Sequence, residues 1–70
     1  MQIIIFSDHA EKRRKQRGLS PLDIGEAIDN AKARYKQKDG TIKAIGKSKG
    51  RKITIIYTRK ENYIRTITIY

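Results

Sequence analysis

The sequence lacks cysteine altogether and contains a single histidine, His9. The absence of cysteine excludes disulfides, thiolate metal sites and cysteine nucleophiles. One histidine also excludes a metal site built from several histidines of one chain. We therefore expect neither a metal ion nor another cofactor.

Long apolar stretches are missing as well. No run approaches the ~20 apolar residues that a membrane-spanning helix requires. The N-terminal stretch MQIIIFSD has no basic residue and is too short for a signal peptide. We therefore expect a cytoplasmic protein without a membrane partner.

Acidic residues are scarce. The 70 residues include 17 Lys and Arg against 7 Asp and Glu, which gives a formal net charge of +10. Such an excess disfavours a compact state by self-repulsion and indicates a polyanionic partner, RNA or DNA. Isoleucine runs, 3–5 and 53–56, argue against disorder. The length predicts one domain over residues 1–70, with a modest core and a shallow surface site.

Capping signals predict two consecutive helices. Ser7 or Asp8 can cap a first helix over residues 9–17, which Gly18 would end. Ser20, followed by Pro21 and Asp23, has the pattern of a capping box with proline in the first turn of a second helix. Apolar residues then recur with helical spacing, at Ile24, Ala27, Ile28 and Ala31.

The remaining residues have strand character. A short strand is predicted over residues 2–6, and four more over 34–38, 41–46, 51–59 and 63–70. Asp39-Gly40 is a strong hairpin signal, and the basic stretch 47–50 is predicted to be a loop. The order β-α-α-β-β-β-β predicts an α+β fold, with two helices packed on one face of a twisted antiparallel sheet.

The first predicted helix has almost no apolar surface, because Ala10 is its only aliphatic residue. His9, Arg13 and Arg17 recur every four residues and lie along one side. One interpretation is a solvated basic helix in which His9 has a structural role. The alternative is that His9 and Arg13 belong to a site that binds and cleaves a phosphodiester.

These residue types suit RNA cleavage without a metal. Histidine titrates near neutrality and can act as a general base or acid. Arginine matches phosphate oxygens with a planar, permanently charged fork. A tyrosine hydroxyl can orient a group or donate a proton, and the terminal strands offer Tyr57, Tyr63 and Tyr70.

Basic residues also gather between the helices and the last hairpin. They can protect an exposed sheet edge from aggregation, or they can follow the phosphates of a nucleic acid, and both can hold. The stretch 46–50 resembles a phosphate loop in composition only, because it joins two strands. The predicted nucleic-acid-binding residues are Lys12, Arg14, Arg17, Arg34, Lys36, Lys47, Lys49, Arg51 and Lys52.

Two motifs carry a resemblance to a known family. The first runs from His9-Ala10 through Arg13 to Arg17-Gly18-Leu19-Ser20, and the second covers 53–57 and 64–70. Together they resemble the DUF4258 family over nearly the whole chain. That family is similar to RelE/ParE-type toxins and to the barnase–EndoU–colicin–RelE grouping of small ribonucleases. The resemblance implies two N-terminal helices against a twisted antiparallel sheet, and a metal-independent endoribonuclease that is often the toxin of a toxin–antitoxin pair.

The resemblance also implies site residues. His9, Arg13 and Arg17 match the first motif, and Arg65, Thr68 and Tyr70 match the last. From the residue types we hypothesise that His9 is a general acid or base, that Arg13 and Arg65 hold the scissile phosphate, and that Tyr57 or Tyr70 assists. The expected partners are RNA, including mRNA on the ribosome, and an acidic antitoxin. The alternatives are a non-catalytic RNA- or DNA-binding module and a ParE-like inhibitor of an acidic protein.

Strand alternation raises a difficulty for this site. In a regular strand Arg65 shares a face with Ile67 and Ile69, whereas Thr68 and Tyr70 point to the other face. These residues can line one cleft only if a bulge or the strand end intervenes.

Overall fold

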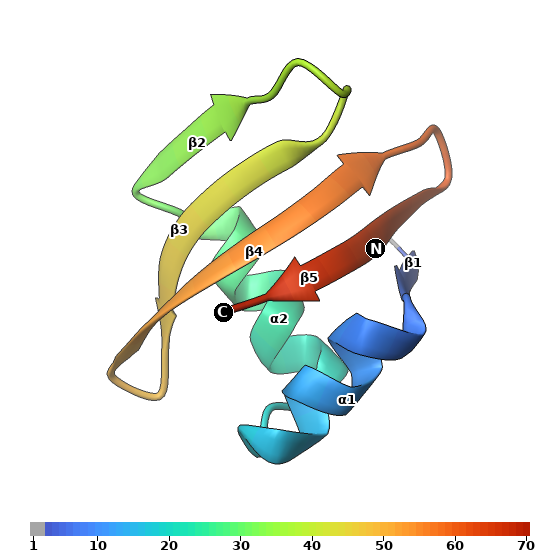
Figure 1. Ribbon diagram of the computed structural model, residues 1–70. Helices are drawn as coiled ribbons and strands as arrows, with labels where there is room; N and C mark the ends of the chain where they lie inside the picture. The colour runs from blue at the N-terminus through green and yellow to red at the C-terminus, as the bar shows by residue number, and fades with distance from the viewer. Residues whose placement is uncertain (1–2) are drawn as a thin grey trace.

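A computed structural model describes residues 3–70 and contains two helices and five strands in the order β-α-α-β-β-β-β (Figure 1). The predicted start of the first strand, Gln2, lies outside the described residues. The elements are β1 (Ile3–Phe6), α1 (Asp8–Gln16), α2 (Pro21–Asp29), β2 (Ala33–Lys36), β3 (Ile42–Ser48), β4 (Arg51–Arg59) and β5 (Tyr63–Ile69).

Both helices begin at the predicted caps. The Ser7 hydroxyl accepts a hydrogen bond from the Ala10 backbone N–H at 3.1 Å, which caps α1. α1 ends before Gly18, whose φ of +67° is the left-handed conformation that glycine adopts easily. Ser20 and Asp23 form the predicted capping box of α2, with Pro21 in its first turn.

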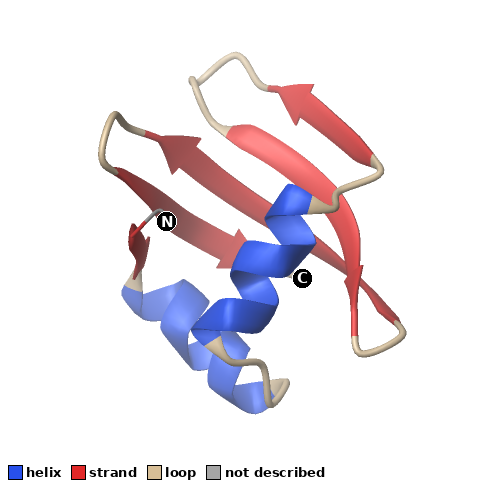
Figure 2. Ribbon diagram, turned by 180° about the vertical axis from the view of Figure 1, so that it is seen from behind, coloured by secondary structure: helices blue, strands red, loops and turns tan. Residues whose placement is uncertain are grey.

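The strands form one sheet in the order β1-β5-β4-β3-β2. β2 to β5 make the predicted antiparallel meander, whereas β1 pairs with β5 in parallel, so the sheet is mixed. A parallel neighbour cannot be joined by a tight turn, and here α1, α2 and three strands separate β1 from β5. Both helices lie on one side of the sheet, as the view from behind shows (Figure 2). The predicted α+β fold is confirmed.

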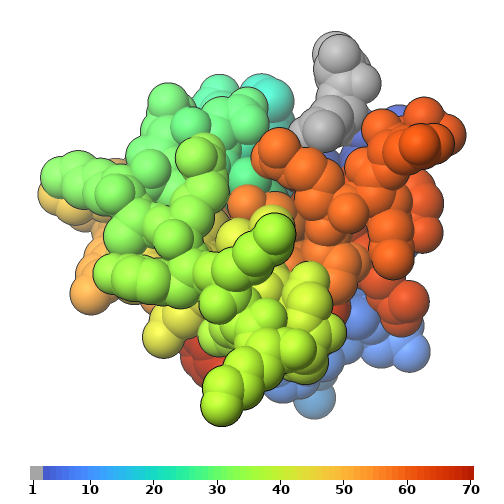
Figure 3. Space-filling view, turned by 90° about the horizontal axis from the view of Figure 1, so that it is seen from above, coloured from blue at the N-terminus to red at the C-terminus, as the bar shows by residue number. Residues whose placement is uncertain are grey.

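The strand ends differ from the prediction mainly at the β3–β4 hairpin. The predicted loop 47–50 is a two-residue turn, because β3 continues through Ser48. Lys49 and Gly50 both have positive φ, 53° and 77°, as a tight hairpin turn requires. β2 also ends at Lys36, two residues earlier than predicted. The β3–β4 turn lies at the opposite end of the sheet from the β2–β3 and β4–β5 turns, and Figure 3 shows the end with the latter two turns from above.

The core lies between α2 and strands β3 to β5. Ile24, Ala27 and Ile28 of α2 are fully buried, as their helical spacing predicts. They pack with apolar side chains of the sheet such as Ile55 and Ile69. α2 comes so close to β3 that a Cβ atom on Gly46 would stand 2.6 Å from the Ala27 carbonyl oxygen. Glycine at position 46 therefore allows this close contact between helix and sheet.

Candidate functional site

The start of α1 is fixed to the middle of β5. The Ser7 backbone N–H donates to the carbonyl oxygen of Thr66 at 2.9 Å. The Ser7 hydroxyl donates to the carbonyl oxygen of Ile67 at 2.7 Å while it caps the helix. Ala10, fully buried, is the residue through which α1 packs onto the domain. The first turn of α1 is thus held against one point of the sheet.

That point is an irregularity in β5. Thr68 pairs with Ile56, and the next residue of β4, Tyr57, pairs with Thr66. Ile67 is therefore an extra residue without a partner on β4, which is a β-bulge. The bulge lies beside the hydrogen bond that anchors Ser7.

The pairing register shows which residues face away from the helices. Directly opposed residues of paired strands point to the same side, and Ala44, Ile55 and Ile69 are buried on the helix side. We call the other side the helix-free face. One row of this face, across the strands, consists of Tyr35, Lys43, Ile56 and Thr68. The neighbouring rows of the same face contain Ala33, Ile45, Thr54, Tyr70, Thr58, Arg65, Ile5, Lys47, Lys52, Tyr63 and Ile3.

The bulge resolves the difficulty that strand alternation raises. Arg65 is opposite Thr58 and Thr68 is opposite Ile56, so both lie on the helix-free face. Tyr70 joins them there, because its backbone N–H donates to the Thr54 carbonyl oxygen at 2.8 Å. A regular strand would have turned Arg65 to the opposite side from Thr68 and Tyr70.

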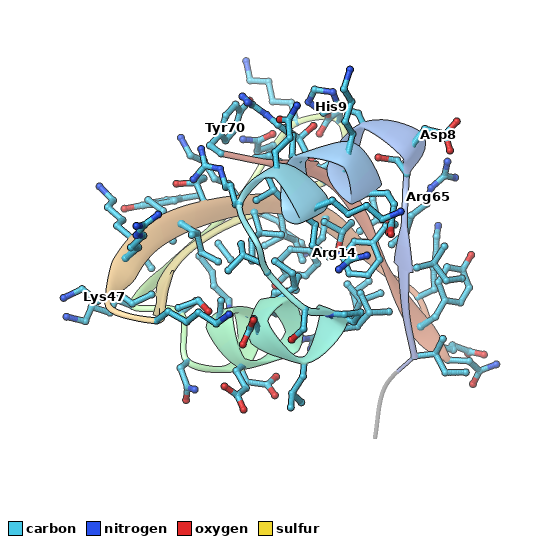
Figure 4. All side chains as sticks on the ribbon, turned by 90° about the horizontal axis from the view of Figure 1, so that it is seen from below. Asp8, His9, Arg14, Lys47, Arg65 and Tyr70 are labelled. Carbon is cyan, nitrogen blue, oxygen red and sulfur yellow. The ribbon has the colours of Figure 1, made fainter. Side chains whose placement is uncertain are left out.

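His9 and Arg13 extend this group from α1. His9 is exposed, whereas Arg13 is half-buried, with a buried Nε atom that has no hydrogen-bond partner. Figure 4 shows His9 and Tyr70 on the same side of the molecule, away from α2. It also shows Arg65 near Asp8, at the start of α1. Figure 4 thus places His9 and Tyr70 on one side of the molecule and Arg65 beside the start of α1.

Tyr57 does not join this region. It is 1 % exposed and belongs to the core on the helix side of β4. Its partner Thr66 is also fully buried, with a hydroxyl that has no hydrogen-bond partner. Of the two tyrosines predicted to assist, Tyr57 and Tyr70, only Tyr70 lies on the helix-free face with Arg65.

Arg14 and Arg34 are occupied by contacts within the protein. The Arg14 side chain is 14 % exposed, forms an ion pair with Glu11 and donates to the Leu19 carbonyl oxygen at 2.8 Å. Its guanidinium carbon lies 5.3 Å from the centre of the Phe6 ring. Arg34 donates to the carbonyl oxygens of Ile28 and Asp29, at 2.7 and 3.2 Å, at the C-terminal end of α2. Both stabilise helix ends or helix packing, roles that do not require a nucleic acid.

Three other predicted cations surround a pocket. A cavity of about 300 Å³ lies between the α1–α2 loop and the β3–β4 turn, and Arg17, Lys49 and Arg51 line it. Lys49 is partly neutralised, because its Nζ atom lies 3.5 Å from Asp23 Oδ2 and 3.2 Å from the Gly18 carbonyl oxygen. Arg17 and Arg51 have no such ion pair among the described residues and remain available to an anion.

The last four predicted cations are divided between the two sides of the sheet. Lys47 and Lys52 face each other on the helix-free face, and Lys36 lies on the helix side, where its partner is Ile42. Lys12 is exposed on α1. Lys43, one of the basic residues between the helices and the last hairpin, lies beside Tyr35. In β3, Lys43, Ile45 and Lys47 alternate with the apolar or small residues that face the helices. This period of two was the signal that could have identified the helix-free face.

One carboxylate in this region has a shifted pKa. The Ser20 backbone N–H donates to Asp23 Oδ2 at 2.9 Å, and this bond, with Lys49 nearby, lowers the pKa of Asp23.

Over residues 3–70 no three His, Cys, Asp or Glu side chains are grouped to hold a metal ion. Within the same range no helix is long and apolar enough to cross a membrane.

These features define a small basic α+β domain with one covered and one open sheet face. The model of the family described as a domain of unknown function, DUF4258, matches residues 6–70. The chain therefore belongs to the DUF4258 family. Comparison with curated proteins and with solved structures found no significant match.

Proposed function

We propose that the protein is a metal-independent endoribonuclease. The observation that carries the proposal is the bulge at Ile67, which places Arg65, Thr68 and Tyr70 on one face beside the start of α1. His9 of α1 lies on the same side of the molecule as Tyr70 (Figure 4), and Arg13 follows one helical turn further along α1. Bulges are common next to active sites because they change the direction of a side chain without ending the sheet.

The proposed reaction is an attack by the 2′-hydroxyl of RNA on the adjacent phosphorus. A bond forms from the 2′-oxygen to phosphorus, and the bond from phosphorus to the 5′-oxygen breaks. The 2′-hydroxyl proton passes to a base, and a proton from an acid goes to the leaving 5′-oxygen. His9 supplies one of these proton transfers and Tyr70 is the candidate for the other.

The arginines stabilise charge in this reaction. Negative charge builds up on the phosphoryl oxygens in the transition state, and guanidinium groups stabilise it through paired hydrogen bonds. Arg65 approaches from the open face, and the half-buried Arg13 approaches from α1. Thr68, which lies on the same face of β5 as Arg65, can orient the ribose or a bound water.

We further propose that the enzyme is the toxin of a toxin–antitoxin pair, with mRNA on the ribosome as a candidate target. The net charge of +10 supports an acidic antitoxin that covers the basic surface, because complementary charge speeds encounter. Co-purification from the native host tests this directly. Recovery of the protein without an acidic partner, together with normal growth on overexpression, would refute the toxin assignment.

Single-turnover cleavage of a long RNA tests the enzymatic assignment. His9→Ala should slow cleavage by about 10²- to 10⁴-fold, the usual effect of removing one proton-transfer group, and leave binding nearly intact. Arg65→Ala should reduce both rate and affinity. Arg59→Ala is the matched control, because Arg59 lies on the neighbouring strand but on the opposite side, with Ile64 as its partner. Cleavage by His9→Ala at the wild-type rate would remove His9 from the mechanism.

A non-catalytic RNA- or DNA-binding module is the second candidate. The burial of Tyr57 favours it, because one potential proton donor is thereby withdrawn from the surface. Absence of cleavage by the wild-type protein, with and without ribosomes, combined with salt-sensitive binding, would establish this function instead.

A further inference from the structure

The helix-free face carries most of the exposed large hydrophobic side chains of the described residues. Five large hydrophobic side chains are exposed, and four of them, Ile3, Ile5, Tyr35 and Tyr70, lie on this face. Tyr35 and Tyr70 are 55 % and 52 % exposed. Grouped exposed apolar residues of this kind are typical of a binding surface.

The charge of this face identifies what it can bind. Lys43, Lys47, Lys52 and Arg65 lie on it, and it contains no aspartate or glutamate among its paired residues. Two copies of the face would therefore repel each other, which disfavours a homodimer through this surface. A polyanion is attracted to this face, which carries cations on β3, β4 and β5.

The combination of tyrosines and cations on this face favours one class of polyanion, a single-stranded nucleic acid. Surfaces that bind unpaired strands combine cations along the backbone with aromatic rings on which bases stack. Tyr35 lies next to Lys43 in one row. Tyr63 begins β5 and Tyr70 directly follows it, on either side of Arg65. A paired duplex keeps its bases stacked on one another and cannot use these rings.

We propose that the helix-free face is a platform for single-stranded RNA, on which Tyr35, Tyr63 and Tyr70 stack against bases. Lys43, Lys47, Lys52 and Arg65 contact the phosphates. The identification of the strand as RNA rests on the proposed function. A strand that crosses from β2 to β5 passes Tyr35 and Lys43 first and then reaches Arg65, Thr68 and the start of α1. The platform therefore supplies substrate to the proposed cleavage site.

Tyr35 is the residue that tests the platform best. It is exposed on the edge strand β2, so its replacement leaves the core intact. It is also separated from the proposed catalytic residues on β5 by β3 and β4. Loss of base stacking corresponds to a roughly 5- to 150-fold loss of affinity. Tyr35→Phe keeps the ring and should bind like the parent protein.

The experiment measures fluorescence anisotropy of a short labelled oligouridylate with His9→Ala as the parent, so that cleavage does not consume the probe. Tyr35→Ala in this parent should weaken binding by roughly 5- to 150-fold. Leu22→Ala, which replaces an exposed side chain of α2, should leave binding unchanged. A duplex RNA of equal length should bind more weakly than the single strand. Unchanged affinity of Tyr35→Ala, or equal affinity for the duplex, would overturn the platform. The platform would also be overturned if this face mediated dimerisation or captured a protein partner and Tyr35→Glu abolished that contact.

The platform and the nuclease can fail separately. If the wild-type protein binds the single strand through Tyr35 but cuts no RNA, the platform stands and the nuclease assignment falls. If it cuts RNA at a rate and affinity that Tyr35→Ala does not change, the nuclease stands and the platform falls.

Discussion

The close approach of α2 to β3 makes a sharp prediction for Gly46→Ala. The new Cβ would stand 2.6 Å from the Ala27 carbonyl oxygen and 3.5 Å from the Ala31 Cα. Carbon–oxygen contacts of this kind normally measure roughly 3.3–3.6 Å, so α2 would have to retreat by about 0.7–1.0 Å from the sheet. Overpacking of a core typically costs about 1–3 kcal/mol. For a domain of this size that cost lowers Tm by roughly 4–24 °C.

Gly25→Ala is the matched control, because it adds the same methyl group within α2. Its Cβ would meet only the Ile4 Cδ1 atom, at 3.1 Å, the far end of a flexible side chain beside an open groove. Alanine favours helix over glycine by about 1 kcal/mol, so this variant should be as stable as the wild type or slightly more stable. Thermal unfolding followed by circular dichroism measures both variants. A Tm for Gly46→Ala equal to that for Gly25→Ala would refute the packing of α2 on β3.

Three further predictions concern the charged residues. Arg14→Ala should destabilise the fold by about 1–3 kcal/mol, because it leaves the Leu19 carbonyl oxygen without its donor, whereas exposed Lys12→Ala should change stability by less than about 0.5 kcal/mol in denaturant unfolding. The pKa of Asp23 is lowered in the folded state, mainly by the Ser20 N–H. The contribution of Asp23 to stability is therefore present above the unfolded-state pKa and is lost as the pH falls through the folded-state value. Asp23→Asn should flatten the acid limb of a Tm–pH curve, and an unchanged limb would contradict this. Single-stranded RNA should bind with a log–log salt slope of about −3 if the four cations of the helix-free face each neutralise one phosphate, and a flat dependence would remove every nucleic-acid interpretation.

Local signals in the sequence were sufficient for most of the fold. Both helix starts follow from a hydroxyl that accepts a backbone N–H, a contact between residues three positions apart, so Ser7 and Ser20 identify them directly. The buried side of α2 follows from the helical spacing of Ile24, Ala27 and Ile28. The pairing of β1 with β5 had no local signal, because it joins segments at opposite ends of the chain.

The candidate site could be predicted only in part for the same reason. His9 and Arg13 share a side of one helix, and helical spacing shows this. The position of Arg65 relative to Thr68 depends on one bulged residue, Ile67, whose neighbours have an ordinary strand composition. The roles of Arg14 and Arg34 depend on tertiary contacts with Phe6 and with the end of α2, so both cations resembled free ones in the sequence.

Product analysis of a defined single-stranded RNA in the presence of EDTA tests the central claim most directly. The proposed reaction predicts cleavage that leaves a 2′,3′-cyclic phosphate, and it predicts that one 2′-deoxy nucleotide at the cleavage position blocks the cut while binding persists. His9→Ala should yield the same product at a rate lower by about 10²- to 10⁴-fold. Cleavage of the 2′-deoxy substrate, or a product that lacks the cyclic phosphate, would contradict the attack by the 2′-hydroxyl and with it the proposed function.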